Sequence, residues 1–175
     1  MKAINSYIIE KLRISKDSKN KFNYKPKNNK ELKSLINKLI KERGNNADLN
    51  DIDVSNVKQM NDIFSYSEFN GDISSWDVSN VTNMWGMFYG SKFNGDISSW
   101  NVSNVIHMYN MFAYSKFNGD ISSWDVSNVR YMHRMFYNCP FNGDISKWDV
   151  SNVKDMEDMF KYCPLENNPP KWYKK

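Results

Sequence analysis

The chain has 175 residues, of which 40% are hydrophobic and 15% aromatic, a composition that suits a folded domain and excludes intrinsic disorder. No apolar run approaches the roughly 18 residues that a membrane-spanning helix needs. Charge is divided unevenly: residues 1–43 carry 13 Lys and Arg against 4 Asp and Glu (net +9), whereas residues 44–175 carry 11 against 16 (net −5). We therefore expect a basic helical head, residues 1–44, joined to a body of different composition.

The basic head predicts two helices. Residues 3–13 place apolar side chains at helical spacing, and a second such pattern runs over residues 28–43. Asn28 and Glu31 resemble a capping box at the start of this second segment, and Gly44 is a natural stop. We expect the second helix to cap the first coil of the body, whose apolar end would otherwise face water. The first helix is expected to serve in addressing or docking.

The basic head also gives expectations about the protein's binding partners and its location in the cell. Its basic charge could attract nucleic acid or an acidic partner, but arginine and aromatic residues suited to base stacking are scarce in it. We therefore favour a solvated lysine-rich face over nucleic-acid binding. The N-terminus shows no signal-peptide pattern and no lipid-accepting cysteine. A cytoplasmic or virion-associated protein is expected.

The body is a tandem repeat. The stretch FNGDISSWDVSNV begins at Phe69, and close copies begin at 24-residue intervals at Phe93, Phe117 and Phe141. A degenerate copy precedes them, and a truncated copy begins at Leu165. Periods of this size are typical of solenoids, whose terminal units are atypical because they cap the stack. We expect about five repeats over residues 45–172, followed by a short tail, residues 173–175.

Within one repeat, the apolar positions fit neither one helix nor one strand. They are Phe69, Ile73, Trp76, Val78, Val81, Met84, Met87 and Phe88. The stretch DISSW suits a short strand, while Val81, Met84 and Phe88 recur at helical spacing. The pattern predicts an α/β repeat solenoid: a leucine-rich-repeat-like stack of strand-plus-short-helix coils with an N-terminal helical cap.

Candidate chemistry within the repeats is sparse. One aspartate recurs at the same place in successive repeats, as Asp72, Asp96, Asp120 and Asp144. We favour turn and edge hydrogen bonding for this row over calcium binding, because calcium solenoids use denser Gly/Asp motifs. His107 and His133 stand at different repeat positions without further ligands at zinc spacing. We expect no metal, no cofactor and no enzyme activity, because no catalytic motif can be assembled either.

Two cysteines, Cys139 and Cys163, stand 24 residues apart and so occupy the same position of adjacent coils. Their α-carbons should lie near 5 Å, within disulfide range. Serine occupies that position in earlier repeats, as Ser67, Ser91 and Ser115. A small, partly buried turn position favours two free stacked thiols over a disulfide.

The positions that vary between repeats indicate a binding surface. They flank the core methionines on the predicted short helices, so their side chains should point outward on the convex side. In the central coils they are rich in the Trp, Tyr, His and Arg side chains that dominate interface hot spots. The candidate partner-binding residues are Trp85, Tyr89, Tyr109, Tyr131, His133 and Arg134. The alternative, a surface that drifts without selection, stays open.

The phrase FNGDISSWDVSNVTNMWGMF, with its W-D-V-S-N-V and M-F elements, resembles the BspA-like leucine-rich-repeat family of bacterial surface proteins. Its short form occurs in Mycoplasma lipoproteins and in gut bacteria and their phages. The resemblance covers residues 45–172 and implies a curved right-handed solenoid that binds proteins or host surfaces, without implying an enzyme. The chain departs from the surface-protein pattern because it lacks a signal peptide, a lipobox and a wall anchor.

Two functions remain as hypotheses. The first is a non-enzymatic protein–protein interaction module that presents a rigid repeat surface to an unidentified protein partner. The second is a structural or packaged phage component whose first helix acts as an address, because MKAINSYIIEKL loosely resembles the targeting peptides of some tailed phages.

Overall fold

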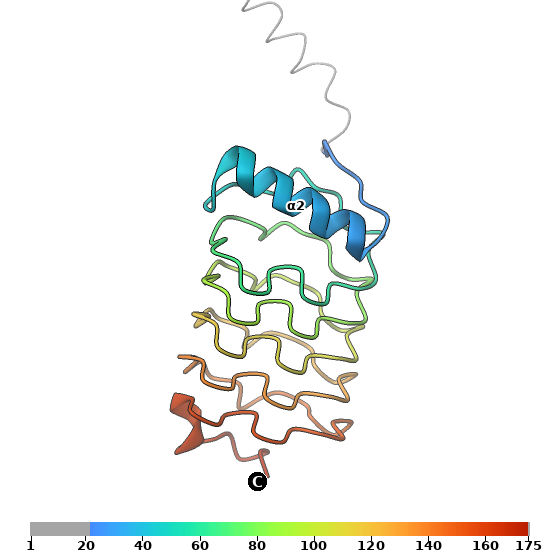
Figure 1. Cartoon of the computed structure of the whole chain (residues 1–175). Helices are drawn as coiled ribbons and strands as arrows, with labels where there is room; N and C mark the ends of the chain where they lie inside the picture. The colour runs from blue at the N-terminus through green and yellow to red at the C-terminus, as the bar shows by residue number, and fades with distance from the viewer. Residues whose placement is uncertain (1–21, 175) are drawn as a thin grey trace, which may run out of the picture.

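A computed structural model describes residues 22–174 as a stack of coils (Figure 1). Helix α2, Asn29–Arg43, lies across one end of the stack, and the C-terminus lies at the other (Figure 1). Among the described residues, one 3-10 turn, η1, Pro164–Glu166, begins at the last residue of the fifth coil. The first predicted helix, residues 3–13, lies outside the described residues. No helix in the described part of the chain is long and apolar enough to cross a membrane.

The ends of α2 are set by the two signals that the sequence shows. The side chain of Asn28 accepts a hydrogen bond from the N–H of Glu31 at 3.0 Å. The Glu31 carboxylate in turn accepts from the N–H of Lys27 at 2.9 Å, one residue before the expected partner of a capping box. At the other end, Gly44 has a left-handed φ of 89° and donates its N–H to Ile40 at 2.8 Å. The helix predicted over residues 28–43 is confirmed.

Helix α2 covers the first coil with its apolar face. Leu32, Ile36 and Leu39 are at most 1% exposed and belong to the same core cluster as the coils. At the C-terminal end of the helix, Arg43 forms an ion pair with Asp51 of the first coil at 2.9 Å. The apolar end of the stack is thereby removed from water.

The coils contain neither strands nor short helices, so the prediction of an α/β repeat solenoid is wrong. Within residues 22–174, α2 is the only α-helix, and the pairing between coils is limited to isolated parallel bridges such as Asn83 with His107. For reference, the coils are numbered first to fifth and comprise residues 45–68, 69–92, 93–116, 117–140 and 141–164.

Left-handed residues prevent the predicted short helices. Gly86 has a φ of 58° and Gly90 a φ of 63°, so a left-handed residue interrupts any right-handed helix over VTNMWGMF, and a second one follows two residues after it. Every coil has left-handed backbone at these two positions, which are Asp62, Tyr66, Gly86, Gly90, Asn110, Tyr114, Arg134, Asn138, Asp158 and Tyr162. The segment is a series of tight turns instead.

These turns direct alternate N–H groups toward the next coil. The N–H of Met84 donates to the carbonyl of His107 at 2.9 Å, and the N–H of Phe88 donates to that of Met111 at 2.9 Å. Intervening N–H groups close turns within the coil, as Met87 does onto Met84 at 3.2 Å. The hydrogen bonds that a helix would make along the chain are made between coils.

The predicted strand is also replaced by turns. The Asp72 carboxylate accepts from the N–H of Ser74 at 2.9 Å, and the N–H of Trp76 closes a turn onto Ile73 at 3.2 Å. Aspartate followed by serine favours such side-chain turns, which compete with strand pairing.

Side chains join the coils on this side of the stack. The indole N–H of Trp100 donates to the carbonyl of Ile73 in the preceding coil at 3.2 Å. The side chain of Asn70 accepts from the N–H of Asn94 in the next coil at 2.7 Å. The same two bonds recur further down the stack, for example from Trp124 at 3.1 Å.

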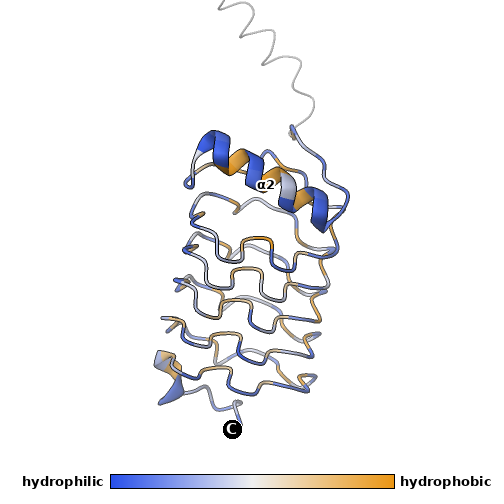
Figure 2. Ribbon diagram, viewed as in Figure 1, coloured by the Kyte–Doolittle hydropathy of each residue, from blue (hydrophilic) through white to orange (hydrophobic). Residues whose placement is uncertain are grey.

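The core is one continuous cluster of buried side chains. Apolar stretches of the chain recur in successive coils (Figure 2). All eight predicted apolar positions of the second coil are buried, with exposures of at most 4%. Equivalent rings stack on one another: Trp76 on Trp100 with centroids 6.4 Å apart, and Phe88 on Phe112 at 5.6 Å. A side chain that packs well on its own copy is favoured in every coil, which accounts for the uniform core.

Candidate protein-binding surface

The turn segment of each coil alternates core side chains with outward-facing ones. In the second coil, Met84, Met87 and Phe88 have no measurable exposure, whereas Trp85 and Tyr89 are partly exposed. In the second coil the variable positions therefore lie on the surface, as predicted, but on tight turns rather than on short helices. In the third coil Ala113, the equivalent of Tyr89, is buried instead.

Four of the six candidate residues form two adjoining rows, which we call the aromatic rows. In the first row, Trp85 stacks on Tyr109 at 5.5 Å and Tyr109 stacks on His133 at 4.7 Å. In the second, His107 stacks on Tyr131 at 5.1 Å. The rows meet where His107 contacts Tyr109 edge to face at 6.2 Å. Stacking along the coils holds these side chains in fixed positions.

Tyr89 belongs to a separate row that spans all five coils, the tyrosine ladder. Its members are Tyr66, Tyr89, Tyr114, Tyr137 and Tyr162, with successive ring centroids 5.2, 5.5, 5.3 and 5.3 Å apart. Arg134, the sixth candidate, lies with its guanidinium 5.7 Å from the Tyr137 ring centroid and 3.3 Å from the Asp158 carboxylate. Arg134 thus belongs with the ladder and not with the aromatic rows.

The sequence reasoning missed the most exposed aromatic residues. Tyr66, Tyr114 and Tyr162 are 73%, 47% and 62% exposed. They occupy the second left-handed position of odd-numbered coils, whereas even-numbered coils place their tyrosine one residue earlier. In the even-numbered coils, Gly90 and Asn138 occupy the position that tyrosine holds in the odd-numbered coils. Space at this position is limited, because a Cβ added to Gly90 would lie 2.8 Å from the Tyr66 ring. Considering the two adjacent positions as a pair would have revealed the ladder.

Two tyrosines of the candidate surface have raised pKa values. Partial burial, followed by the hydroxyl of Tyr66, raises the pKa of Tyr89. Burial, followed by the nearby Asp62 carboxylate, raises the pKa of Tyr109. Both phenols are therefore protonated hydrogen-bond donors at neutral pH. His133 Nδ1 lies 3.0 Å from an Asp155 carboxylate oxygen without hydrogen-bond geometry, a contact that is attractive when the ring is protonated.

The repeated aspartates have a structural role in turns. The Asp96 carboxylate accepts from both the N–H and the hydroxyl of Ser98, at 2.9 and 2.7 Å. These bonds to the charged form lower the pKa of Asp96. The turn bonding predicted for this row is confirmed. Among residues 22–174, no group of three or more His, Cys, Asp or Glu side chains is arranged to hold a metal ion.

Both cysteines are buried free thiols, as predicted. Each donates to the backbone carbonyl of the first residue of its own coil: Cys139 to Phe117 at 3.2 Å, and Cys163 to Phe141 at 3.1 Å. Burial raises the pKa of Cys139 and raises that of Cys163 to about 11. Protonated, buried thiols are poor nucleophiles, so both act as small packing residues.

Comparison with known families gives a match over nearly all of the repeat body. A family model described as "Mycoplasma protein of unknown function, DUF285" matches residues 30–138 and again residues 67–173. The chain belongs to this family. DUF285 is a repeat family whose description assigns no activity. Neither a search of curated proteins nor a search of solved structures found a match.

Proposed function

We propose that this DUF285 protein is a non-enzymatic protein–protein interaction module that presents a rigid aromatic surface. The observation that supports it most is the pair of aromatic rows beside the tyrosine ladder, because exposed aromatic side chains gather on one type of segment across all coils. The proposed surface comprises the six candidate residues, Trp85, Tyr89, Tyr109, Tyr131, His133 and Arg134, together with Tyr66, Tyr114 and Tyr162.

The physical chemistry of these side chains suits recognition. Tyrosine and tryptophan offer a large contact area with few rotatable bonds, so little entropy is lost when a partner orders them. Their mutual stacking, as between Trp85 and Tyr109, fixes them before binding. Side chains at equivalent positions differ from coil to coil, which gives the surface a means to discriminate between partners.

The other half of the coil is less suited to discrimination. It repeats aspartate and serine almost unchanged, and the aspartate oxygens are engaged in turns such as the one from Asp120 to Ser122 at 2.9 Å. The resemblance of the repeat to BspA-like surface proteins, which bind proteins or host surfaces, agrees with an interaction module. The packaged-phage hypothesis depends on residues outside the described part of the chain, and no observation favours it.

Quantitative capture tests the proposal. Immobilised wild-type protein and the triple variant Trp85→Ala, Tyr109→Ala, Tyr131→Ala are exposed to the same protein mixture, and captured proteins are quantified by mass spectrometry. We expect specifically enriched proteins to decrease by about tenfold or more with the triple variant, because it removes three anchor side chains. A matched variant, Ser75→Ala, Ser99→Ala, Ser123→Ala, should retain them.

The proposal is wrong if the aromatic variant captures the same proteins as the wild type. Lost stacking costs about 0.5–1.5 kcal/mol per pair, so thermal unfolding must show that the variant is folded at the assay temperature. A second variant, Tyr66→Phe, Tyr114→Phe, Tyr162→Phe, keeps the rings and removes only the hydroxyls. It separates the contribution of hydrogen bonding from that of contact area.

A further inference from the structure

An Asn–Gly dipeptide recurs at the same place in each of the second to fifth coils. The four copies are Asn70–Gly71, Asn94–Gly95, Asn118–Gly119 and Asn142–Gly143. All four stand in the same local sequence, FNGDIS. A difference in chemical reactivity between them therefore has to come from the fold and not from the neighbouring residues.

The fold requires a glycine in this dipeptide. A Cβ added to Gly143 would lie 2.8 Å from the Phe141 ring, and a Cβ added to Gly95 would lie 2.8 Å from the Phe93 ring. A glycine after asparagine has a chemical consequence, because its backbone nitrogen carries no bulky neighbour and can approach the asparagine side chain.

Asparagine in this setting is converted by an intramolecular reaction in which water is the only co-reactant. The backbone nitrogen of the glycine loses its proton and attacks the side-chain carbonyl carbon, Cγ. The bond from Cγ to the side-chain nitrogen breaks, and ammonia leaves carrying the proton. Water then opens the five-membered succinimide ring at either carbonyl, which gives aspartate or isoaspartate. The reaction starts only when the side chain rotates so that Cγ reaches the following nitrogen.

Three of the four asparagine side chains are held in place by the next coil. The side-chain oxygen of Asn70 accepts a hydrogen bond from the N–H of Asn94 at 2.7 Å. Asn118 provides the same bond to Asn94 at 2.7 Å, and Asn142 provides it to Asn118 at 2.9 Å. Rotation of the side chain toward the glycine breaks this bond, so the reaction is slowed at these three sites.

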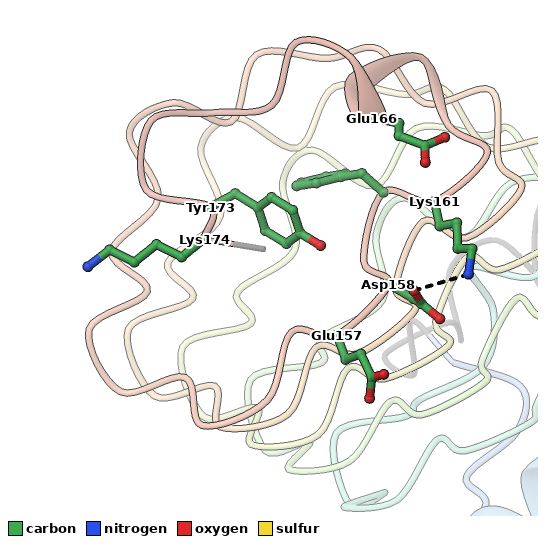
Figure 3. Close-up of a pocket in the computed structure, with 7 residues that line it drawn as sticks. Glu157, Asp158, Lys161, Glu166, Tyr173 and Lys174 are labelled. Carbon is green, nitrogen blue, oxygen red and sulfur yellow. Dashed lines mark ion pairs between the residues drawn. The ribbon is translucent and has the colours of Figure 1, made fainter.

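The side chain of Asn142 lacks this bond. Glu166 stands 24 residues later, at the position of the donor, but its N–H closes the η1 turn onto the carbonyl of Cys163 at 2.9 Å. The Glu166 carboxylate lines a separate cavity of about 360 Å³ (Figure 3), where it accepts from the N–H of Tyr162 at 2.8 Å. Among residues 22–174, the Asn142 side chain has no hydrogen-bond partner.

Asn142 and Gly143 also have room to react. Both line a cavity of about 560 Å³ between the fifth coil and the residues that follow it, together with Ser146, Leu165 and Lys171. Asn142 is exposed, and the N–H of Gly143 has no acceptor among the described residues. The side chain can therefore rotate, and water can enter, without displacing a core residue.

We propose that Asn142 is a site of spontaneous deamidation, and that the fold protects the three equivalent asparagines from the same reaction. The product places a carboxylate in the cavity that Asp144 and Lys171 also line. Isoaspartate in addition inserts a methylene group into the backbone just before the turn from Asp144 to Ser146. The aromatic rows and the tyrosine ladder lie in the other half of the coil, so this inference does not depend on the proposed function.

Peptide mass spectrometry of the full chain tests the proposal, because cleavage after lysine and arginine places the four dipeptides on four separate peptides. The protein is incubated at mildly alkaline pH, at a temperature at which thermal unfolding shows it to be folded. We expect Asn142 to convert at least about fivefold faster than the three other asparagines, which is the factor that one hydrogen bond is worth. In urea, where the fold is lost, the four sites should convert at similar rates.

A matched variant restores the missing bond. The triple variant Leu165→Phe, Glu166→Asn, Asn167→Gly reproduces the sequence PFNG of the preceding coil, whose asparagine N–H supplies the bond to Asn118 at 2.9 Å. Conversion of Asn142 should then slow to the rate of the other sites, whereas Leu165→Phe alone should leave it fast.

Three results overturn the inference. The first is equal conversion of the four sites in the folded wild-type chain, and the second is a folded chain in which Asn142 does not convert. The third is a folded triple variant in which Asn142 converts as fast as in the wild type, because the missing hydrogen bond is then not the cause.

Discussion

The two halves of a central coil are joined to the neighbouring coils by different kinds of hydrogen bond. In the half that begins at Phe93 and ends at Asn104, side chains make the hydrogen bonds to neighbouring coils, as Trp100 does to Ile73 at 3.2 Å. In the half from Val105 to Lys116, backbone groups make them, as Phe112 does to Met135 at 2.9 Å. We call these the side-chain-bonded half and the backbone-bonded half.

This difference explains where the sequence varies between repeats. A side chain that carries a bond between coils must be the same in every coil, so Asn and Trp recur in the side-chain-bonded half. Backbone bonds do not depend on residue type, so outward positions such as Tyr109 and His133 are free to differ. The fold thereby separates a constant half that holds the stack together from a variable half available for recognition.

Replacing a central core residue of the side-chain-bonded half should have the largest effect. Trp100→Ala removes a ring stacked on Trp76 and the hydrogen bond to Ile73, and should lower the free energy of unfolding by about 3–5 kcal/mol. Trp172→Ala should cost less, because Trp172 is partly exposed and, among the described residues, stacks on one tryptophan only. Urea unfolding measures both. Equal losses would mean that the coils do not share their core.

The second-largest loss of stability is expected from substituting a left-handed residue of the backbone-bonded half. Gly90→Ala places a side chain on a left-handed residue and should cost about 1–2 kcal/mol, with a further contribution from contact with the Tyr66 ring. Gly90→Asn should cost less in backbone energy, because asparagine tolerates this conformation. The double variant Tyr66→Ala, Gly90→Ala separates the two contributions in thermal unfolding. If Gly90→Ala alone is neutral, the left-handed turns are not required.

Two alanine variants, one in each half of the coil, compare how much side chains of the two halves contribute to stability. Asn94→Ala removes the acceptor for the N–H of Asn118, 2.7 Å away, and should cost about 0.5–1.5 kcal/mol. Arg130→Ala changes an exposed side chain of the backbone-bonded half and should change stability by less than about 0.5 kcal/mol. Urea unfolding of both variants tests the comparison. The distinction between the halves disappears if Arg130→Ala costs as much as Asn94→Ala.

The smallest expected effect is the contribution of the repeated aspartates to the pH dependence of stability. Hydrogen bonds from Ser98 and Ser122 lower the pKa values of Asp96 and Asp120 in the folded state. Their contribution to stability is therefore present above the unfolded pKa, near about 3.9, and is lost as pH falls through the lower folded value. Thermal unfolding between neutral and acidic pH should show the decline.

Asparagine is the control for this pH dependence, because Asn101 already makes the equivalent turn bond to the N–H of Ser103 at 3.1 Å. Asp96→Asn with Asp120→Asn should keep the turns and flatten the decline in acid. An unchanged pH profile would show that other groups govern acid stability.

Much of this arrangement was predictable from the sequence, and the exceptions have physical causes. The buried positions and the caps of α2 follow from apolar periodicity and from Asn28 and Gly44. The short helices were predicted wrongly because Val81, Met84 and Phe88 have helical spacing, which a series of turns also satisfies. Left-handed backbone at bulky residues such as Tyr66 leaves no mark in the sequence, and the glycines in the second coil alone gave a hint.

The candidate surface was predictable to a similar degree. Variation between repeats identified four members of the aromatic rows, Trp85, Tyr109, Tyr131 and His133, but His107 was not among the candidates. The tyrosine ladder was missed because its members alternate between two adjacent positions, so that neither position is tyrosine in every coil.

Scalar couplings across hydrogen bonds test the central claim, that backbone groups join neighbouring coils in the variable half. In an isotope-labelled sample, the amide nitrogen of Phe88 should couple to the carbonyl carbon of Met111, and that of Met84 to the carbonyl carbon of His107. A coupling from Phe88 to Met84, four residues earlier in the chain, would instead demonstrate a short helix and contradict this account.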